Sequence, residues 1–179
     1  MTMKLESQTV PSSFNDDPQA WLTQQAGEYS LNTLLAYADD GAIWGRIENG
    51  VLTLAGAAYP EVAVALRAST LQQARLFGSG GELMLWKDGG DFCARLITET
   101  AEDDASHLDQ CYQLWGRGIE VRNGFTLMEE GREGLYHAPP ENNGLGRRMQ
   151  LTVRHYLAED ENGQTYINAS RLVELKTTE

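Results

Sequence analysis

Two of the three histidines are the side chains best suited to acid–base chemistry near neutral pH: His137 in LYHAPP and His155 in VRHYL. A catalytic histidine needs a nucleophile or a second titratable group within hydrogen-bond reach, and the sequence places neither beside these two. His155 shares the parity of the apolar residues in its predicted strand, so we expect a core histidine bonded to a neighbour. His137 precedes a Pro-Pro pair, which predicts a position at a contact surface.

Pairs of carboxylates are the other groups that could exchange protons. They lie at Asp39-Asp40, Asp103-Asp104 and Asp160-Glu161, each in a predicted turn. Aspartate is common in turns because its side chain accepts hydrogen bonds from the nearby backbone, so we do not expect these pairs to be catalytic. The run from Gly78 to Gly81 lacks the lysine and the following helix of a phosphate-binding loop.

The two cysteines, Cys93 and Cys111, lie in apolar contexts and are not at a metal-ligand spacing. We expect buried free thiols in a reducing cytosol, and no zinc site. The first residues of the chain are polar, and no apolar run approaches the roughly 18–20 residues that a membrane span needs. The sequence therefore predicts a cytoplasmic protein with no membrane contact, no metal and no cofactor.

The chain is strongly acidic, with a formal net charge of −12 and an isoelectric point of about 4.6. Repulsion from phosphate makes free nucleic acid an unexpected ligand of the isolated chain. The basic residues are 11 arginines and three lysines. Arginine suits bidentate contacts and stacking on aromatic rings, but codon usage in a GC-rich genome explains the excess more simply than an arginine-rich contact face.

The elements that must position these side chains are hairpins. The stretch from Ala42 to Leu54, AIWGRIENGVLTL, joins two apolar runs through Asn49-Gly50, the strongest local signal for a tight hairpin turn. Trp-Gly-Arg followed by Asn-Gly returns between Leu114 and Leu127, with a looser echo between Leu83 and Leu96. We predict strands near residues 34–38, 43–47, 51–54, 71–77, 82–86, 92–98, 110–115, 119–122, 125–128, 148–158 and 164–175.

The N-terminal region is predicted to hold one short helix. It begins at Pro18 with Asp17 as its cap and runs to Ala26, where Gly27 can end it. Residues 1–17 are polar and irregular, which predicts a flexible tail. The four tryptophans are expected to pack in the core or at its rim rather than to stack on nucleotide bases; they are Trp21, Trp44, Trp86 and Trp115.

Regularly spaced strands with turn residues between them predict a mainly β fold. Antiparallel meanders and hairpins would form a barrel or a sandwich, preceded by the short helix. Residues 18–179 would make up a single β-rich domain. The acidic segment 101–109 is expected to be a solvated loop with His107 at the surface.

The last predicted hairpin has two unlike faces. The apolar side of its first strand carries Met149, Leu151, Val153 and His155, whereas the polar side carries Arg148, Gln150, Thr152, Arg154 and Tyr156. The second strand adds Arg171 to the polar side. Candidate contacts to RNA or to a partner are therefore Arg147, Arg148, Arg154 and Arg171, together with His137 and Arg46. For Arg46 we favour pairing with an acidic neighbour over an outward position facing a partner.

Several phrases of the sequence resemble a known family. They are LLAYADDGAIWGR (34–46), TLQQARLFG (70–78), GELMLWKDG (81–89), GFTLMEEGREGLYHAPP (124–140), RHYL (154–157) and SRLVEL (170–175). Through them the chain, from about residue 30 to 175, resembles the small accessory proteins found with type III-D CRISPR effector modules. The resemblance implies a non-catalytic accessory subunit of an RNA-guided, RNA-targeting complex in antiviral defence, with nuclease and cyclase activities in other subunits.

The implied partners are other type III-D CRISPR effector subunits, with CRISPR RNA or target RNA contacted indirectly or through local arginines. An acidic chain can dock on basic RNA-binding neighbours through its own charge. The alternative, from a different class, is a small enzyme acting on RNA or a nucleotide with His137 or His155 as acid or base. No catalytic residue is carried over from the family.

Overall fold

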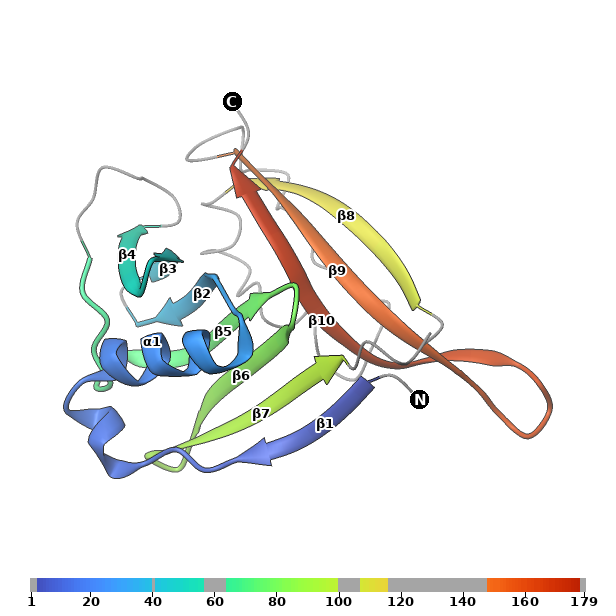
Figure 1. Ribbon diagram of the computed structural model, residues 1–179, viewed down its shortest axis with the longest axis horizontal. Coiled ribbons are helices and arrows are strands. Elements are labelled where there is room, and N and C mark those ends of the chain that lie inside the picture. The colour runs from blue at the N-terminus through green and yellow to red at the C-terminus, as the bar shows by residue number, and fades with distance from the viewer. Residues whose placement is uncertain (1–2, 40, 57–63, 100–106, 116–147, 178–179) are drawn as a thin grey trace.

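The computed structural model describes residues 3–39, 41–56, 64–99, 107–115 and 148–177. Within these residues the chain forms two antiparallel sheets, one of seven strands in the order β1-β7-β6-β5-β2-β3-β4 and one of three in the order β10-β9-β8 (Figure 1). The strands are β1 (Met3–Gln8), β2 (Thr33–Ala38), β3 (Gly41–Glu48), β4 (Val51–Gly56), β5 (Leu71–Gly78), β6 (Gly81–Asp88), β7 (Asp91–Glu99), β8 (His107–Trp115), β9 (Arg148–Glu159) and β10 (Thr165–Thr177).

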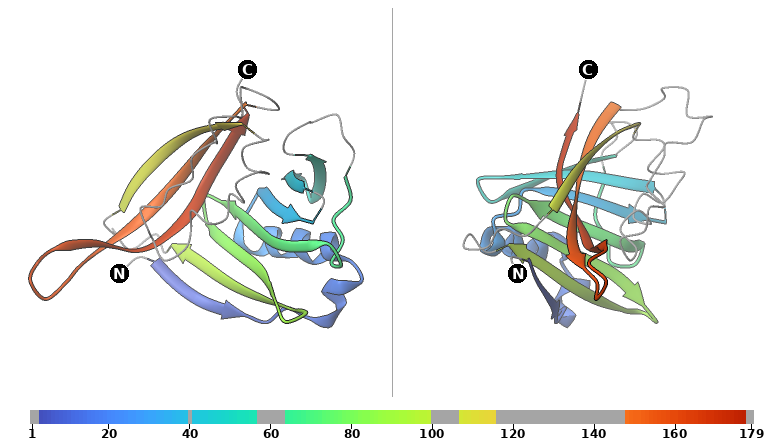
Figure 2. Two further views of the ribbon diagram at one scale, coloured as in Figure 1. Left: turned by 180° about the vertical axis from the view of Figure 1, so that it is seen from behind. Right: turned by 90° about the vertical axis from the view of Figure 1, so that its right-hand side faces the viewer.

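The two sheets are open and do not form a closed barrel. In the described residues β1 and β4 are the opposite edges of the seven-stranded sheet and do not pair with each other. The smaller sheet lies across the larger one, with β10 against β5 and β6, as Figures 1 and 2 show. The mainly β prediction, with antiparallel hairpins and one short N-terminal helix, is confirmed, whereas the barrel alternative is wrong because the two sheets meet through side chains.

Helix α1 (Pro18–Tyr29) begins where the sequence predicts, with the Asp17 side chain accepting a hydrogen bond from the backbone N–H of Ala20 at 3.1 Å. It does not end at Gly27. The helix continues for two residues to Tyr29 and is capped by Ser30 in the left-handed conformation, with φ of 56°. Tertiary packing carries it past the glycine, whose helix propensity is unfavourable by only about 1 kcal/mol.

The prediction that residues 1–17 form an irregular tail is wrong for residues 3–8 and 12–15, which form regular secondary structure. Residues 3–8 form β1, an edge strand paired with β7, and a 3₁₀ turn, η1 (Ser12–Asn15), follows. Phe14 in that turn is fully buried and packs edge-on against Trp21 of α1, with ring centroids 5.4 Å apart. Burial of this aromatic ring fixes the segment to the domain.

The main core lies between α1 and one face of the seven-stranded sheet. Leu22 and Ala26 of the helix pack against apolar residues at alternate strand positions; those of the central strands are Leu34, Ala36, Ala74, Leu76, Leu83, Leu85, Ala94 and Leu96. The opposite face carries Thr33, Trp44, Arg46, Arg75, Glu82 and Ile97 by the same alternation. That face meets the smaller sheet, so one side of the sheet is apolar and the other contains charges.

The predicted hairpins at 42–54 and 83–96 are confirmed as β3-β4 and β6-β7, and β9-β10 is confirmed as the last one. The predicted hairpin around Asn123-Gly124 lies outside the described residues. The acidic loop was predicted to run to Asp109, but β8 already begins at His107. His107 is exposed, as expected.

Candidate functional site

The turn at Asn49-Gly50 positions the first cluster of interest. Both central residues have positive φ, 52° and 76°, as a type I′ turn requires. The two-residue loop pairs Glu48 with Val51 and so fixes the register of β3 and β4. In this register Trp44 and Arg46 project from the face of the sheet opposite α1.

Gly45 lies between those two side chains and faces the helix side. A Cβ atom there would come within 2.9 Å of a Leu54 methyl carbon, 3.1 Å of a Leu52 methyl carbon and 3.2 Å of the Thr53 carbonyl oxygen. The missing side chain therefore lets the leucines of β4 pack across β3 onto the core. This accounts for the glycine of the Trp-Gly-Arg sequence at this hairpin.

Arg46 connects the two sheets. Its Nη1 donates to Thr33 Oγ1 at 3.1 Å, and its Nη2 donates to the carbonyl oxygen of Leu175 in β10. The guanidinium carbon lies 5.3 Å from the centre of the Trp44 ring, within cation–π distance. Among the described residues no carboxylate forms an ion pair with Arg46, so the acidic partner that we expected for it is not found in this part of the chain.

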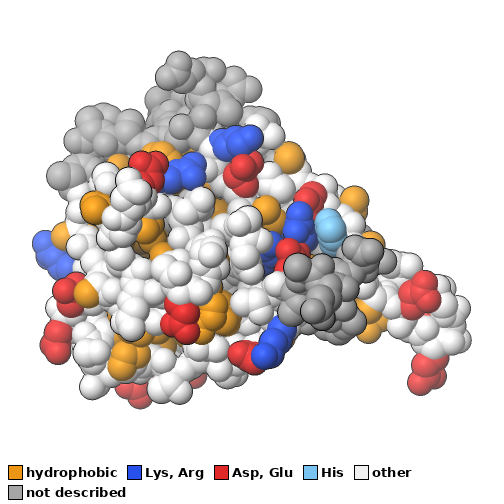
Figure 3. Space-filling model, viewed as in Figure 1, with side chains coloured by type: hydrophobic (Ala, Val, Ile, Leu, Met, Phe, Trp, Pro, Cys, Tyr) orange, Lys and Arg blue, Asp and Glu red, His pale blue; other side chains and the backbone are white. Residues whose placement is uncertain are grey.

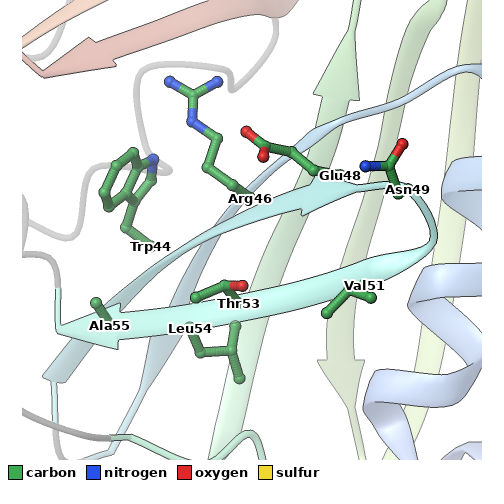
Figure 4. A pocket seen from close by; sticks show the side chains of 8 residues that line it. All are labelled: Trp44, Arg46, Glu48, Asn49, Val51, Thr53, Leu54 and Ala55. Carbon is green, nitrogen blue, oxygen red and sulfur yellow. The ribbon is translucent and has the colours of Figure 1, made fainter.

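Trp44 and Arg46 border an open hollow of about 530 Å³ above β3 and β4. Figure 4 shows Trp44, Arg46 and Glu48 rising from β3 on one side of the ribbon. The other lining residues are Asn49, Val51, Thr53, Leu54 and Ala55. Besides the Glu48 carboxylate, the hollow offers an indole ring, a fixed guanidinium and uncharged side chains. These groups suit recognition of a partner's side chain, because tryptophan and arginine are enriched at the centres of interfaces.

A second cluster joins β7 to the smaller sheet around the Glu99 carboxylate. Arg154 Nη1 donates to both Glu99 oxygens at 2.8 and 3.1 Å, and Tyr156 Oη donates to Oε1 at 2.6 Å. Arg154 also donates through Nε and Nη2 to the two Asp109 oxygens, at 2.8 and 2.9 Å. Arg154 is therefore bidentate on Asp109 and shared with Glu99, in the planar geometry that favours arginine over lysine.

The contacts within this cluster shift the pKa values of Glu99, Asp109 and Tyr156. Burial raises the pKa of Glu99, but the hydrogen bonds from Tyr156 and Arg154 and the charge of Arg171 outweigh it, so the Glu99 pKa lies below its ordinary value. The hydrogen bond from Arg154 lowers the pKa of Asp109. Burial, with the hydrogen bond to Glu99, raises the pKa of Tyr156. The carboxylates are therefore held ionised and the phenol is held protonated at neutral pH.

Arg171 is fully buried, so its predicted position on a polar surface is wrong. Its guanidinium reaches the β5-β6 turn, where Nη1 donates to the carbonyl oxygens of Gly78 and Gly81 at 2.9 and 3.3 Å. Nε donates to Tyr156 Oη at 2.8 Å, and Nη2 contacts Glu99 Oε2 at 3.2 Å. The Arg171 side of the last hairpin therefore faces the protein interior, because the seven-stranded sheet supplies carbonyl and carboxylate acceptors for the guanidinium.

His155 is a core histidine, as predicted, and it is buried. Its Nδ1 lies 2.6 Å from Ser170 Oγ, and its Nε2 lies 2.9 Å from Gln110 Oε1. Because an amide oxygen only accepts, Nε2 carries the proton and Nδ1 accepts from the serine hydroxyl. Burial lowers the pKa of His155, which keeps the ring neutral. Both ring nitrogens are thus engaged inside the protein.

The remaining predicted site residues are ones whose side chains the structure does not describe. His137 and Arg147 lie outside the described residues. Arg148 begins β9, but its side chain is not among those described. Contacts of Arg46, Arg148 and Arg154 with RNA or a partner stay predictions. In Figure 3, basic side chains on the visible face lie among acidic ones and form no continuous basic patch in the part of the chain that is described.

Other sequence predictions about chemistry have mixed outcomes. Cys93 and Cys111 are free thiols, but the expected burial is wrong for Cys111, which is exposed on β8, and is met only in part by Cys93, which is half-buried. Among the described residues, no three histidine, cysteine or acidic side chains are grouped closely enough to hold a metal ion. No helix in the same residues is long and apolar enough to cross a membrane.

Sequence inspection missed Glu99 and Tyr156 as centres of the intersheet cluster. Glu99 follows an apolar strand and precedes an acidic segment, so nothing local distinguishes it from a surface carboxylate. Its partners lie 55 and 57 residues away along the chain. Tyr156 lies on the predicted polar face of its strand, two residues after Arg154. An aromatic ring on that face was the one available signal that the face is covered.

Fold and site together define a mainly β protein of two packed antiparallel sheets, with charged side chains joining the sheets and an open tryptophan–arginine hollow on an edge hairpin. The family model described as CRISPR-associated protein Csx19 matches residues 33–175, which is most of the chain. The chain therefore belongs to the CRISPR-associated Csx19 family, and a role in CRISPR defence follows from that membership. The resemblance to CRISPR-associated proteins is confirmed at this level. No curated protein matches the chain.

Proposed function

We propose that this protein is a non-catalytic accessory subunit of a type III-D CRISPR RNA-guided effector complex. Family membership carries the proposal. The protein acts through contacts with other effector subunits and touches the RNA backbone only locally, once those subunits have positioned it. Its acidic charge of −12 favours basic, RNA-binding neighbours as partners over RNA itself.

The hollow beside Trp44 supports a protein contact. Arg46 is held in place by Thr33 and by the Leu175 carbonyl, so the guanidinium is ordered before any partner arrives. A preorganised side chain loses little conformational entropy on binding. Trp44 offers the ring face, and a tryptophan at an interface centre commonly contributes 2 kcal/mol or more, about a 30-fold change in affinity.

The internal engagement of His155 supports the non-catalytic part of the proposal. A general base must reach the proton that it removes, and both nitrogens of this buried ring are bonded to Ser170 and Gln110. Its lowered pKa follows from burial and needs no catalytic explanation. A core histidine accounts for all these contacts.

The test is co-purification of the tagged full-length chain with the effector subunits encoded beside it. We expect the wild type to retain those subunits and CRISPR RNA, and Trp44→Ala to lower retention about 30-fold through the loss of a central contact. Trp21→Ala is the matched control, because it truncates a half-buried tryptophan on the helix side of the sheet. Wild-type protein that retains no effector subunit would overturn the proposal.

RNA cleavage by the assembled complex tests the catalytic alternative. We expect His137→Gln with His155→Gln to leave cleavage unchanged in complexes that assemble normally. Lost cleavage with intact assembly would overturn the non-catalytic assignment. The isolated chain should bind RNA weakly and lose it near physiological salt, and tight, salt-resistant binding would contradict positioning by partners.

A further inference from the structure

Four strands form the edges of the two sheets in the described residues, and β4 differs from the other three. Edge strands are usually protected by charges, proline or bulges against pairing with another chain. β1 carries Lys4 and Glu6, β8 carries Asp109, and β10 carries Glu174 together with two shifts in its register. β4, with the sequence VLTLAG, has no charge, no proline and an unbroken register.

The register assigns a direction to each backbone group of β4. Residues that flank a two-residue turn exchange hydrogen bonds, and bonded and non-bonded pairs alternate along an antiparallel ladder. Val51, Thr53 and Ala55 therefore bond to β3. Leu52 and Leu54 direct their backbone N–H and C=O groups away from β3, and within the described residues no other backbone group bonds to them.

The hollow lies beside the β4 edge, on the face of the sheet opposite α1. Val51, Thr53 and Ala55 form part of its lining beside Trp44 and Arg46, and Val51 is 63% exposed. The side chains of Leu52 and Leu54 pack inward against the core. A strand laid along β4 would therefore place alternate side chains over the hollow, the arrangement by which strand addition gains specificity.

We propose that β4 accepts an extended segment of a partner effector subunit as an eighth strand of the sheet, with alternate apolar side chains over the hollow. This inference rests on the proposed function. Only another extended backbone matches the alternating donors and acceptors of Leu52 and Leu54, which RNA does not. The uncharged lining of β4 matches apolar side chains. A second copy of this chain is disfavoured, because each copy carries a net charge of −12.

Residue-resolved hydrogen exchange on the free chain and on the co-purified effector complex tests the proposal. We expect the Leu52 and Leu54 amides to exchange at least tenfold more slowly in the complex. The Thr53 amide, already bonded to β3, serves as an internal control. Unchanged exchange at Leu52 and Leu54 in an assembled complex would overturn strand addition while leaving the accessory role intact.

A charge placed on the edge gives a second readout. Thr53→Lys adds a cation on the exposed side of β4 and should lower retention of the partner at least tenfold, whereas Gln24→Lys adds the same charge on an exposed position of α1 and should not. Thermal unfolding of both variants checks that they are folded. The proposed occupant would be overturned if folded Thr53→Lys retained the partner fully. It would also be overturned if ribonuclease treatment removed the amide protection, or if the same amides were protected in a dimer of the free chain.

Discussion

Replacement of Arg171 by methionine tests the central claim about how the two sheets are held together. Methionine keeps an apolar stem and removes the guanidinium, which is fully buried. The variant leaves the carbonyl oxygens of Gly78 and Gly81 without this donor and removes one cation from Glu99. Loss of one partner of a buried ion pair costs about 3–5 kcal/mol, because the remaining groups stay desolvated.

The structure places the expected loss of stability in Arg171→Met near the lower end of that range. The Glu99 side chain is 23% exposed and keeps Arg154 as a partner, so its carboxylate remains partly compensated. We expect a decrease of about 3 kcal/mol in the free energy of unfolding, which is a large share of the roughly 5–15 kcal/mol typical of a domain. For a chain of this size, the melting temperature should fall by about 6–12 °C.

Urea unfolding, followed by tryptophan fluorescence and by circular dichroism, measures this loss. Arg67→Met is the control, because Arg67 is exposed and such surface changes usually stay within about 0.5 kcal/mol. Glu99→Gln combined with Arg171→Met should cost less than the sum of the two single changes, since the two residues are in contact. A loss below about 1 kcal/mol for folded Arg171→Met would refute the claim that this buried arginine joins the sheets.

Three further predictions follow from single sites. Gly27→Ala should stabilise the protein by about 0.5–1 kcal/mol, because the glycine lies inside α1 with nothing within 4 Å of an added Cβ; chemical denaturation measures it. Gly45→Ala should destabilise by about 1–2 kcal/mol in the same assay, because the new Cβ would crowd Leu54. Burial lowers the pKa of His155 below 6.5, so its contribution to stability is complete above pH 6.5 and declines as the pH falls through the folded pKa. His155→Gln should abolish that part of the pH dependence, which unfolding at a series of pH values measures. An unchanged dependence of the unfolding free energy on pH would contradict this prediction.

The local parts of the fold could be predicted because the sequence specifies them over a few residues. Asn49-Gly50 fixes its own turn and the register of the strands around it. The Asp17-Pro18 pair likewise marks the start of α1. Both signals act within one turn of the chain, where backbone conformation and side-chain hydrogen bonds decide the outcome.

The N-terminal strand could not be predicted in the same way. Its sequence, MKLESQ, is polar because β1 is an edge strand with exposed side chains such as Leu5, which is 49% exposed. Only pairing with β7 makes it a strand, and that pairing joins positions about 90 residues apart in the chain. Local propensity says little about such a strand, since strand formation depends mainly on context.

The candidate site was accessible from the sequence only in part. Trp44 and Arg46 were recognised, but the partners of Arg46 are Thr33 and the carbonyl of Leu175, the latter 129 residues away. Nothing in the alternation of a strand reveals which surface a second sheet will cover. A polar face therefore looked like solvent surface, although in this fold it lies against another sheet.

The arrangement of the two sheets offers a physical reason for the preference for arginine over lysine. Arg46, Arg154 and Arg171 each reach from one sheet to groups of the other. A planar guanidinium can donate several hydrogen bonds in different directions at once, which an ammonium on a flexible stem does less well. Neither codon usage nor an RNA-contact face is needed to explain these three positions. Among the described residues, the surface that we propose for partners is the uncharged β4 edge with the hollow beside it, where Arg46 serves both the fold and the proposed contact.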